Sequence, residues 1–94
     1  MTAEQELEEF EFDRAVEIVS IIYSLDKDNV YAKLVGLRRR SVIVEALLRC
    51  GASCHDAGVE FAKLIELIWV MSDATNYSGA IIGNTIKQLV IRNH

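Results

Sequence analysis

The sequence predicts an all-α fold, because it contains no proline and its apolar residues recur at intervals of three and four. Hydrophobic residues make up 51% of the 94 residues, and the mean hydropathy is +0.19. A chain of this length is typical of one domain, so residues 1–94 are expected to fold as a single helical domain. We expect a small antiparallel bundle of three to four helices. The apolar surplus predicts that it forms a homo-oligomer, most simply a dimer.

The first predicted helix spans residues 3–25. Its apolar stripe has steps of four, three and four residues and contains Phe12, Val16, Val19 and Tyr23. Its first two turns are mostly glutamate, which suits the positive end of the helix dipole. The segment 9–13 also alternates with period two, as a short strand does, but the heptad spacing continues past it and favours a helix.

The second predicted helix spans residues 29–49 and has the most regular heptad of the chain. Its stripe contains Val30, Leu34, Leu37, Ser41, Val44 and Leu48. Gly36 is a weak point at which this helix could break. Ser41 is the polar residue of the stripe, and we expect its hydroxyl to bond back to the carbonyl of Leu37.

Two further helices are predicted over residues 54–72 and 76–91. Gly51 is expected to end the preceding helix in a left-handed conformation. The segment 79–85 has two glycines but neither the lysine nor the spacing of a phosphate-binding loop. The spacing of Gly79 and Gly83 instead predicts a close approach of two helix backbones. The sequence indicates no internal repeat.

Charge is distributed unevenly along the chain. Residues 1–26 carry a net charge of −7, and residues 27–50 carry +4. This pattern predicts that the cluster Arg38–Arg40 faces carboxylates of the first helix, in the same chain or in a second copy. The sequence pI of about 5.1 is far from the basic character of most nucleic-acid-binding domains.

The function that the sequence favours is a small non-enzymatic protein–protein interaction module, such as a regulator, adaptor, co-chaperone or inhibitor, that acts as a homo-oligomer. Its expected partners are a second copy of itself and another protein. The residues predicted to contact a partner are the basic side chains and the apolar stripe of the second helix: Arg38, Arg39, Arg40, Arg49, Leu34, Leu37 and Val44.

The alternative is a small DNA-binding transcriptional regulator that uses Arg38–Arg40. The run from Arg39 to Leu47 resembles the second helix of ribbon-helix-helix repressors, with residues 9–13 in the place of their strand. The resemblance implies a DNA-binding dimer. It covers about ten residues and departs from the family because residues 26–37 intervene and the candidate strand is acidic. A helix-turn-helix around Gly51 would offer DNA a helix without lysine or arginine in its first turns.

No catalytic, cofactor or metal site is predicted, and the chain is not expected to be an enzyme. Cys50, Cys54 and His55 are neighbours, but a structural zinc site needs four ligands, and no acid is placed to orient the histidine. We expect two buried free thiols. No signal peptide is apparent, and no apolar run approaches the ~20 residues of a membrane span. A cytoplasmic protein without a membrane span is therefore expected.

Overall fold

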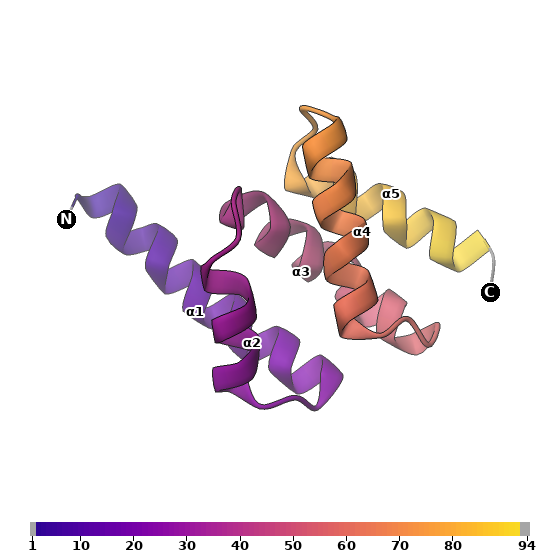
Figure 1. Cartoon of the computed structure of the whole chain (residues 1–94), viewed down its shortest axis with the longest axis horizontal. Coiled ribbons are helices and arrows are strands. Elements are labelled where there is room, and N and C mark those ends of the chain that lie inside the picture. The colour runs from indigo at the N-terminus through magenta and orange to yellow at the C-terminus, as the bar shows by residue number, and fades with distance from the viewer. Residues whose placement is uncertain (1, 93–94) are drawn as a thin grey trace.

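The computed structural model describes residues 2–92, with the side chains of residues 4–10 excepted. Five helices occupy these residues, and no strand occurs among them. The helices are α1 (Ala3–Tyr23), α2 (Lys27–Val35), α3 (Arg40–Asp56), α4 (Phe61–Ala74) and α5 (Gly79–Arg92) (Figure 1). The all-α prediction is confirmed, but the number of helices is five and not three or four. Residues 9–13 are helical, so the strand that the ribbon-helix-helix resemblance requires is not formed.

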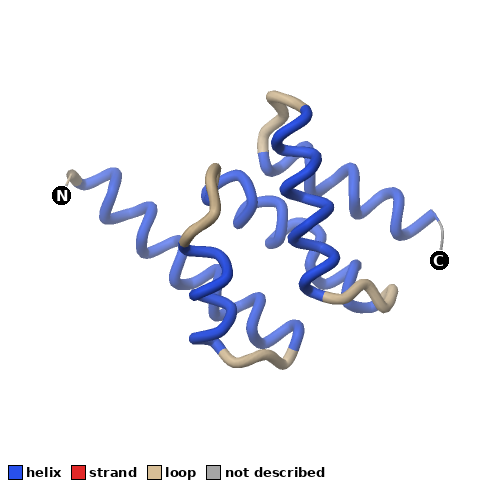
Figure 2. Tube along the Cα trace, viewed as in Figure 1, coloured by secondary structure: helices blue, strands red, loops and turns tan. Residues whose placement is uncertain are grey.

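The helices form two layers. Helices α1, α3 and α5 lie side by side and point the same way, whereas α2 and α4 run back across them on the side nearer the viewer (Figures 1 and 2). The resulting slab measures 44 by 30 by 17 Å between its Cα atoms. Helix α3 lies in the middle of the first layer and contacts α1, α4 and α5.

The predicted second helix is wrong, because the chain breaks after Gly36 into α2 and α3. Arg39 takes a positive φ of 57° at the start of α3. Its guanidinium donates to the carbonyl oxygens of Ser72 and Thr75, at the end of α4. These bonds satisfy acceptors that a helix end leaves free and hold the break in place. Ser41 consequently lies outside any buried stripe and is exposed.

The predicted helix boundaries around Gly51 are also wrong. Helix α3 continues through Gly51, whose missing side chain faces Ile22 of α1, and ends at Asp56. The left-handed residue is Gly58, with φ of 82°. The amide of Val59 donates to the carbonyl of Cys54 over 2.9 Å, which completes a Schellman motif. The next helices therefore begin at Phe61 and Gly79 rather than at 54 and 76.

The core lies between the two layers. Its fully buried large side chains come from α2 to α5 and include Leu34, Ile43, Leu47, Leu64, Ile68 and Ile82; Phe12, Val16 and Val19 complete it from α1. The stripe of α1 predicted from the sequence thus enters the core. Leu34 and Val44 are also buried within the chain, with exposed fractions of 1% and 8%.

The fold repeats a pair of helices, which the sequence pattern alone did not indicate. The pair α1–α2 recurs as α3–α4, and α5 begins a third unit (Figure 1). The segment 31–37, YAKLVGL, matches the segment 61–67, FAKLIEL, at four identical positions. Leu34 and Leu64 occupy the same place in this match and are both buried. In a stack of such units, each pair buries its apolar faces against its neighbours.

Candidate interaction groove

A groove of about 570 Å³ lies between α1 and α3. One wall comes from the middle of α1 and the other from the first half of α3. The lining residues are Glu11, Phe12, Arg14, Ala15 and Ile18 on α1, and Arg40, Ser41, Val44, Glu45 and Leu48 on α3. The groove follows about two helical turns of each wall.

The neighbouring contact between α3 and α5 is closely packed over its first half, and two glycines explain why. A smaller pocket of about 300 Å³ lies at the other end of this contact, between residues 53–57 and Val90 and Ile91. A Cβ atom at Gly79 would overlap the carbonyl oxygen of Val42, and one at Gly83 would lie 2.6 Å from Cβ of Arg49. Real Cβ atoms do not approach so closely, so only glycine fits at these positions. The predicted close approach of helix backbones is confirmed, and α5 is the helix that approaches α3.

Larger residues stand at the equivalent positions of α3. When α3 and α5 are aligned by their buried residues, Ile43 matches Ile82, and Arg40 and Val44 match Gly79 and Gly83. Arg40 and Val44 line the groove on the side that faces α1. The side chains of Arg40 and Val44 therefore hold α1 and α3 apart. The groove is present because these two positions carry side chains where α5 carries glycine.

The apolar part of the groove is open to solvent. Ile18 is 36% exposed and Leu48 is 45% exposed. The apolar surface continues past the groove along α1, where Ile21 is 71% exposed, and into the turn after α1, where Leu25 is 43% exposed. Ile18 and Ile21 follow Arg14 with steps of four and three, so that α1 carries a second apolar stripe on its outer side.

Charges of both signs flank this apolar surface. The guanidinium carbon of Arg40 lies 4.5 Å from the centroid of the Phe12 ring, in a cation–π contact. Glu11, Arg14 and Glu45 also line the groove. Among the side chains that the structure describes, none of these four charges forms an ion pair with another. Such a surface offers both apolar contacts and polar pairing to an amphipathic segment.

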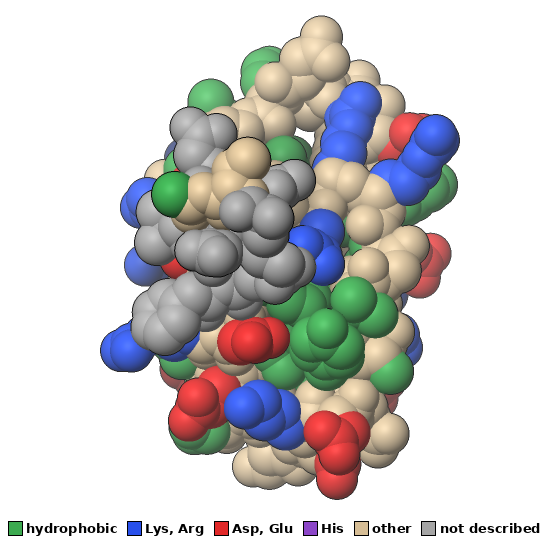
Figure 3. All heavy atoms as spheres, turned by 90° about the vertical axis from the view of Figure 1, so that its left-hand side faces the viewer, with side chains coloured by type: hydrophobic (Ala, Val, Ile, Leu, Met, Phe, Trp, Pro, Cys, Tyr) green, Lys and Arg blue, Asp and Glu red, His purple; other side chains and the backbone are tan. Residues whose placement is uncertain are grey.

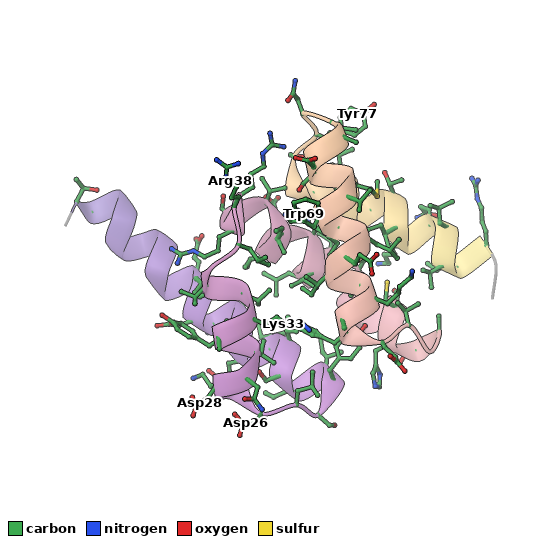
Figure 4. All side chains as sticks on the ribbon, viewed as in Figure 1. Asp26, Asp28, Lys33, Arg38, Trp69 and Tyr77 are labelled. Carbon is green, nitrogen blue, oxygen red and sulfur yellow. The ribbon has the colours of Figure 1, made fainter. Side chains whose placement is uncertain are left out.

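The predicted arginine cluster does not act as one patch. Arg38 is exposed and extends from the loop before α3 (Figure 4), Arg39 caps the end of α4, and Arg40 lies on Phe12. No described carboxylate lies within ion-pair distance of these three. The side chains of residues 4–10, which include four of the acids of the first helix, lie outside the described part of the chain, so the predicted pairing stays a prediction. Arg49 is exposed, and its stem packs beside Gly83. Leu37 is half-buried against the core.

The cysteine region is a packed junction of the two units. Cys50 and Cys54 are buried and free. Burial raises the pKa of the Cys50 thiol to about 12 and also raises the pKa of Cys54, so both remain protonated and unreactive at neutral pH. Tyr23 donates a 3.0 Å hydrogen bond to the carbonyl of Val59. Within the described residues, no three potential ligands group as a metal site would require.

Sequence reasoning missed most of the groove residues. Of the residues that line the groove, the sequence predicts partner contacts only for Arg40 and Val44, and it places Leu48 in a heptad stripe. The signal that could have found Ile18 is the outer stripe from Arg14 to Ile21, which lies beside the buried stripe of Phe12, Val16 and Val19 with the same spacing.

No protein-family model matches the chain, and comparison with curated proteins and with solved structures finds no similar one. Within residues 2–92, none of the helices combines the length and apolar composition needed to cross a bilayer. Function is therefore inferred from the geometry of this chain.

Proposed function

We propose that this chain is a small non-enzymatic protein–protein interaction module that acts as a homo-oligomer and holds an amphipathic helix of another protein in the groove between α1 and α3. The observation that carries the proposal is the open groove itself, with Ile18 and Leu48 accessible between charged rims. A groove two turns long accepts the i, i+3/4 and i+7 anchors of a helix.

The exposed area of the molecule also supports a binding role. The chain exposes 6215 Å², whereas a compact monomer of 10.6 kDa exposes about 5500 Å² by the scaling of area with mass. The excess is of the order of the ~800 Å² that one partner contributes to a standard interface. Large hydrophobic side chains account for part of it, since Ile21, Val70 and Ile91 are each more than half exposed.

DNA binding receives less support from the geometry. Two of the three clustered arginines make contacts within the chain, at the end of α4 and on Phe12. A phosphate-binding face needs several free cations on one side of the molecule. A gel-shift titration with mixed duplex DNA at low salt distinguishes the two functions, and we expect no shift at micromolar protein.

The groove is tested by capture from an extract of the native cell, with proteins identified by mass spectrometry. Ile18→Glu and Leu48→Glu place a charge inside the groove at half-exposed positions, and Val70→Glu does the same on α4, away from it. Proteins bound by the parent and by Val70→Glu are expected to be lost from both groove variants. Equal capture by all four proteins, with unchanged helical circular dichroism, would contradict the proposal.

A further inference from the structure

The repeat shows that one edge of the molecule lacks a neighbour. Phe61 and Ile65 of α4 are 7% and 6% exposed, and Phe61 packs on Tyr23 of the preceding unit. The matching residues of α2, Tyr31 and Val35, are 42% and 39% exposed. The same apolar pair is thus buried in the second unit and open in the first.

The open pair lies on the side of α2 that faces away from α4. Lys33 extends toward α4 (Figure 4), and residues two positions before and after it point to the opposite side of the helix. Tyr31 is held in place by an edge-on contact with Phe12, whose centroid lies 5.5 Å from its own. Figure 3 shows hydrophobic side chains gathered on this end face of the slab. A supported aromatic residue loses little conformational entropy when it is covered.

Opposite charges stand at the two ends of α2. Asp26 and Asp28 lie beside its first turn and Arg38 lies beyond its last one (Figure 4). Lys27 accompanies the two acids, so that the first end keeps a net negative charge. Arg38 is exposed and has no ion-pair partner among the described residues. A surface with an acidic end, an apolar middle and a basic end is complementary to its own copy turned by 180°.

We propose that this edge, formed by Tyr31 and Val35 between Asp28 and Arg38, is a two-fold interface with a second copy of this chain. The α2 helices of the two copies run antiparallel across the axis. Tyr31 and Val35 of each copy cover those of the other, and Asp28 faces Arg38 of the partner subunit. The inference rests on the proposed function because it locates the homo-oligomer named there.

The test is charge reversal, measured by sedimentation equilibrium of the full chain. The parent is expected to form a dimer of twice 10.6 kDa. Asp28→Arg and Arg38→Asp each create two like-charge contacts, so each should raise the dimer dissociation constant by about tenfold or more. The double variant Asp28→Arg/Arg38→Asp restores opposite charges and should return within about threefold of the parent. Asp73→Arg, an exposed reversal on α4, should leave the constant unchanged.

A second pair of variants covers the apolar middle. Val35→Glu should abolish the dimer, whereas Val70→Glu should not. A parent dimer that survives Asp28→Arg, Arg38→Asp and Val35→Glu would overturn this interface while leaving self-association, and the proposed function, intact. A parent that remains monomeric at 100 µM would overturn the interface and the homo-oligomeric part of the proposed function together. Equal capture by the parent and both groove variants, with an unchanged dimer, would overturn the groove part of the proposed function and leave this interface intact.

Discussion

Helix α3 meets its two neighbours in the same layer in different ways. Against α5 its backbone is in direct contact, because Gly79 and Gly83 present no side chains. Against α1 it leaves a groove, because its own Arg40 and Val44 occupy the equivalent positions. One repeated unit can therefore make either a closed core contact or an open site, and two residues on the incoming helix decide which.

The layer of α2 and α4 shows the same contrast. Phe61 and Ile65 of α4 are buried by the preceding unit. The matching residues of α2, Tyr31 and Val35, remain exposed. This pair thus contributes to the core in the second unit and remains accessible in the first unit. The variants below are chosen to disturb one side of this comparison while the other side serves as the control.

The largest effect is expected at the closed contact. Gly79→Ala and Gly83→Ala each place a methyl group against the backbone of α3, so each should cost about 2–3 kcal/mol of unfolding free energy. Gly36→Ala is the matched control, because its new methyl group has no neighbour within 4 Å. Urea denaturation followed by circular dichroism measures all three. A cost below 0.5 kcal/mol (about the noise expected of surface changes) at Gly79 would contradict the close packing.

Alkaline pH should lower the free energy of unfolding through Tyr23 and Cys50, which are packed where the two units meet. Burial raises the pKa of Tyr23 from 10.0 to about 12 and that of Cys50 from 9.0 to about 12. The unfolded chain therefore loses these protons first. The contribution is fully present below pH 9 and is lost as pH rises from 9 to 12. Unfolding free energies measured across this range should fall, and less steeply in Tyr23→Phe than in the control Tyr77→Phe. Equal slopes in the two variants would contradict the role of Tyr23.

The ends of α1 and α3 differ in the residue that takes the left-handed conformation. Gly58 follows α3 with φ of 82°, whereas Ser24 follows α1 with φ of 54°. Gly58→Ala should cost about 1 kcal/mol, and Ser24→Gly should stabilise the protein by about 0.5–1 kcal/mol, since glycine adopts positive φ without strain. Thermal unfolding gives both signs. If both substitutions changed the stability in the same direction, the left-handed conformation assigned to one of the two residues would be contradicted.

The smallest effect is expected at Ser41. It lines the open groove and is exposed, so Ser41→Val should change the unfolding free energy by less than about 0.5 kcal/mol. Ser20, which is buried and bonds to the carbonyl of Val16 over 2.6 Å, is the comparison site. A gain of more than 1 kcal/mol (about the value of burying a methyl group) for Ser41→Val would place Ser41 in a buried seam after all.

Local patterns predicted the helical class, the buried stripe of α1 and the close approach at Gly79 and Gly83. One glycine does not locate the break after Gly36, because the hydrogen bonds that fix the break run from Arg39 to carbonyls more than thirty residues away. The boundary near Gly51 was misplaced since a buried interior glycine and a terminal glycine have the same local signal. The groove depends on how far apart α1 and α3 pack, which the periodicity of either helix does not report.

The central claim is that the exposed apolar residues of the first helix pair, including Tyr31 and Val35 on the edge of α2, form a binding surface of this chain. Hydroxyl-radical footprinting at 1 µM and at 100 µM tests it on two tyrosines within one sample. Tyr31 and Tyr77 are 42% and 56% exposed, so both should react in the dilute protein. We expect oxidation of Tyr31 to fall severalfold at the higher concentration while that of Tyr77 stays constant. Protection of Tyr77 without protection of Tyr31 would contradict the account.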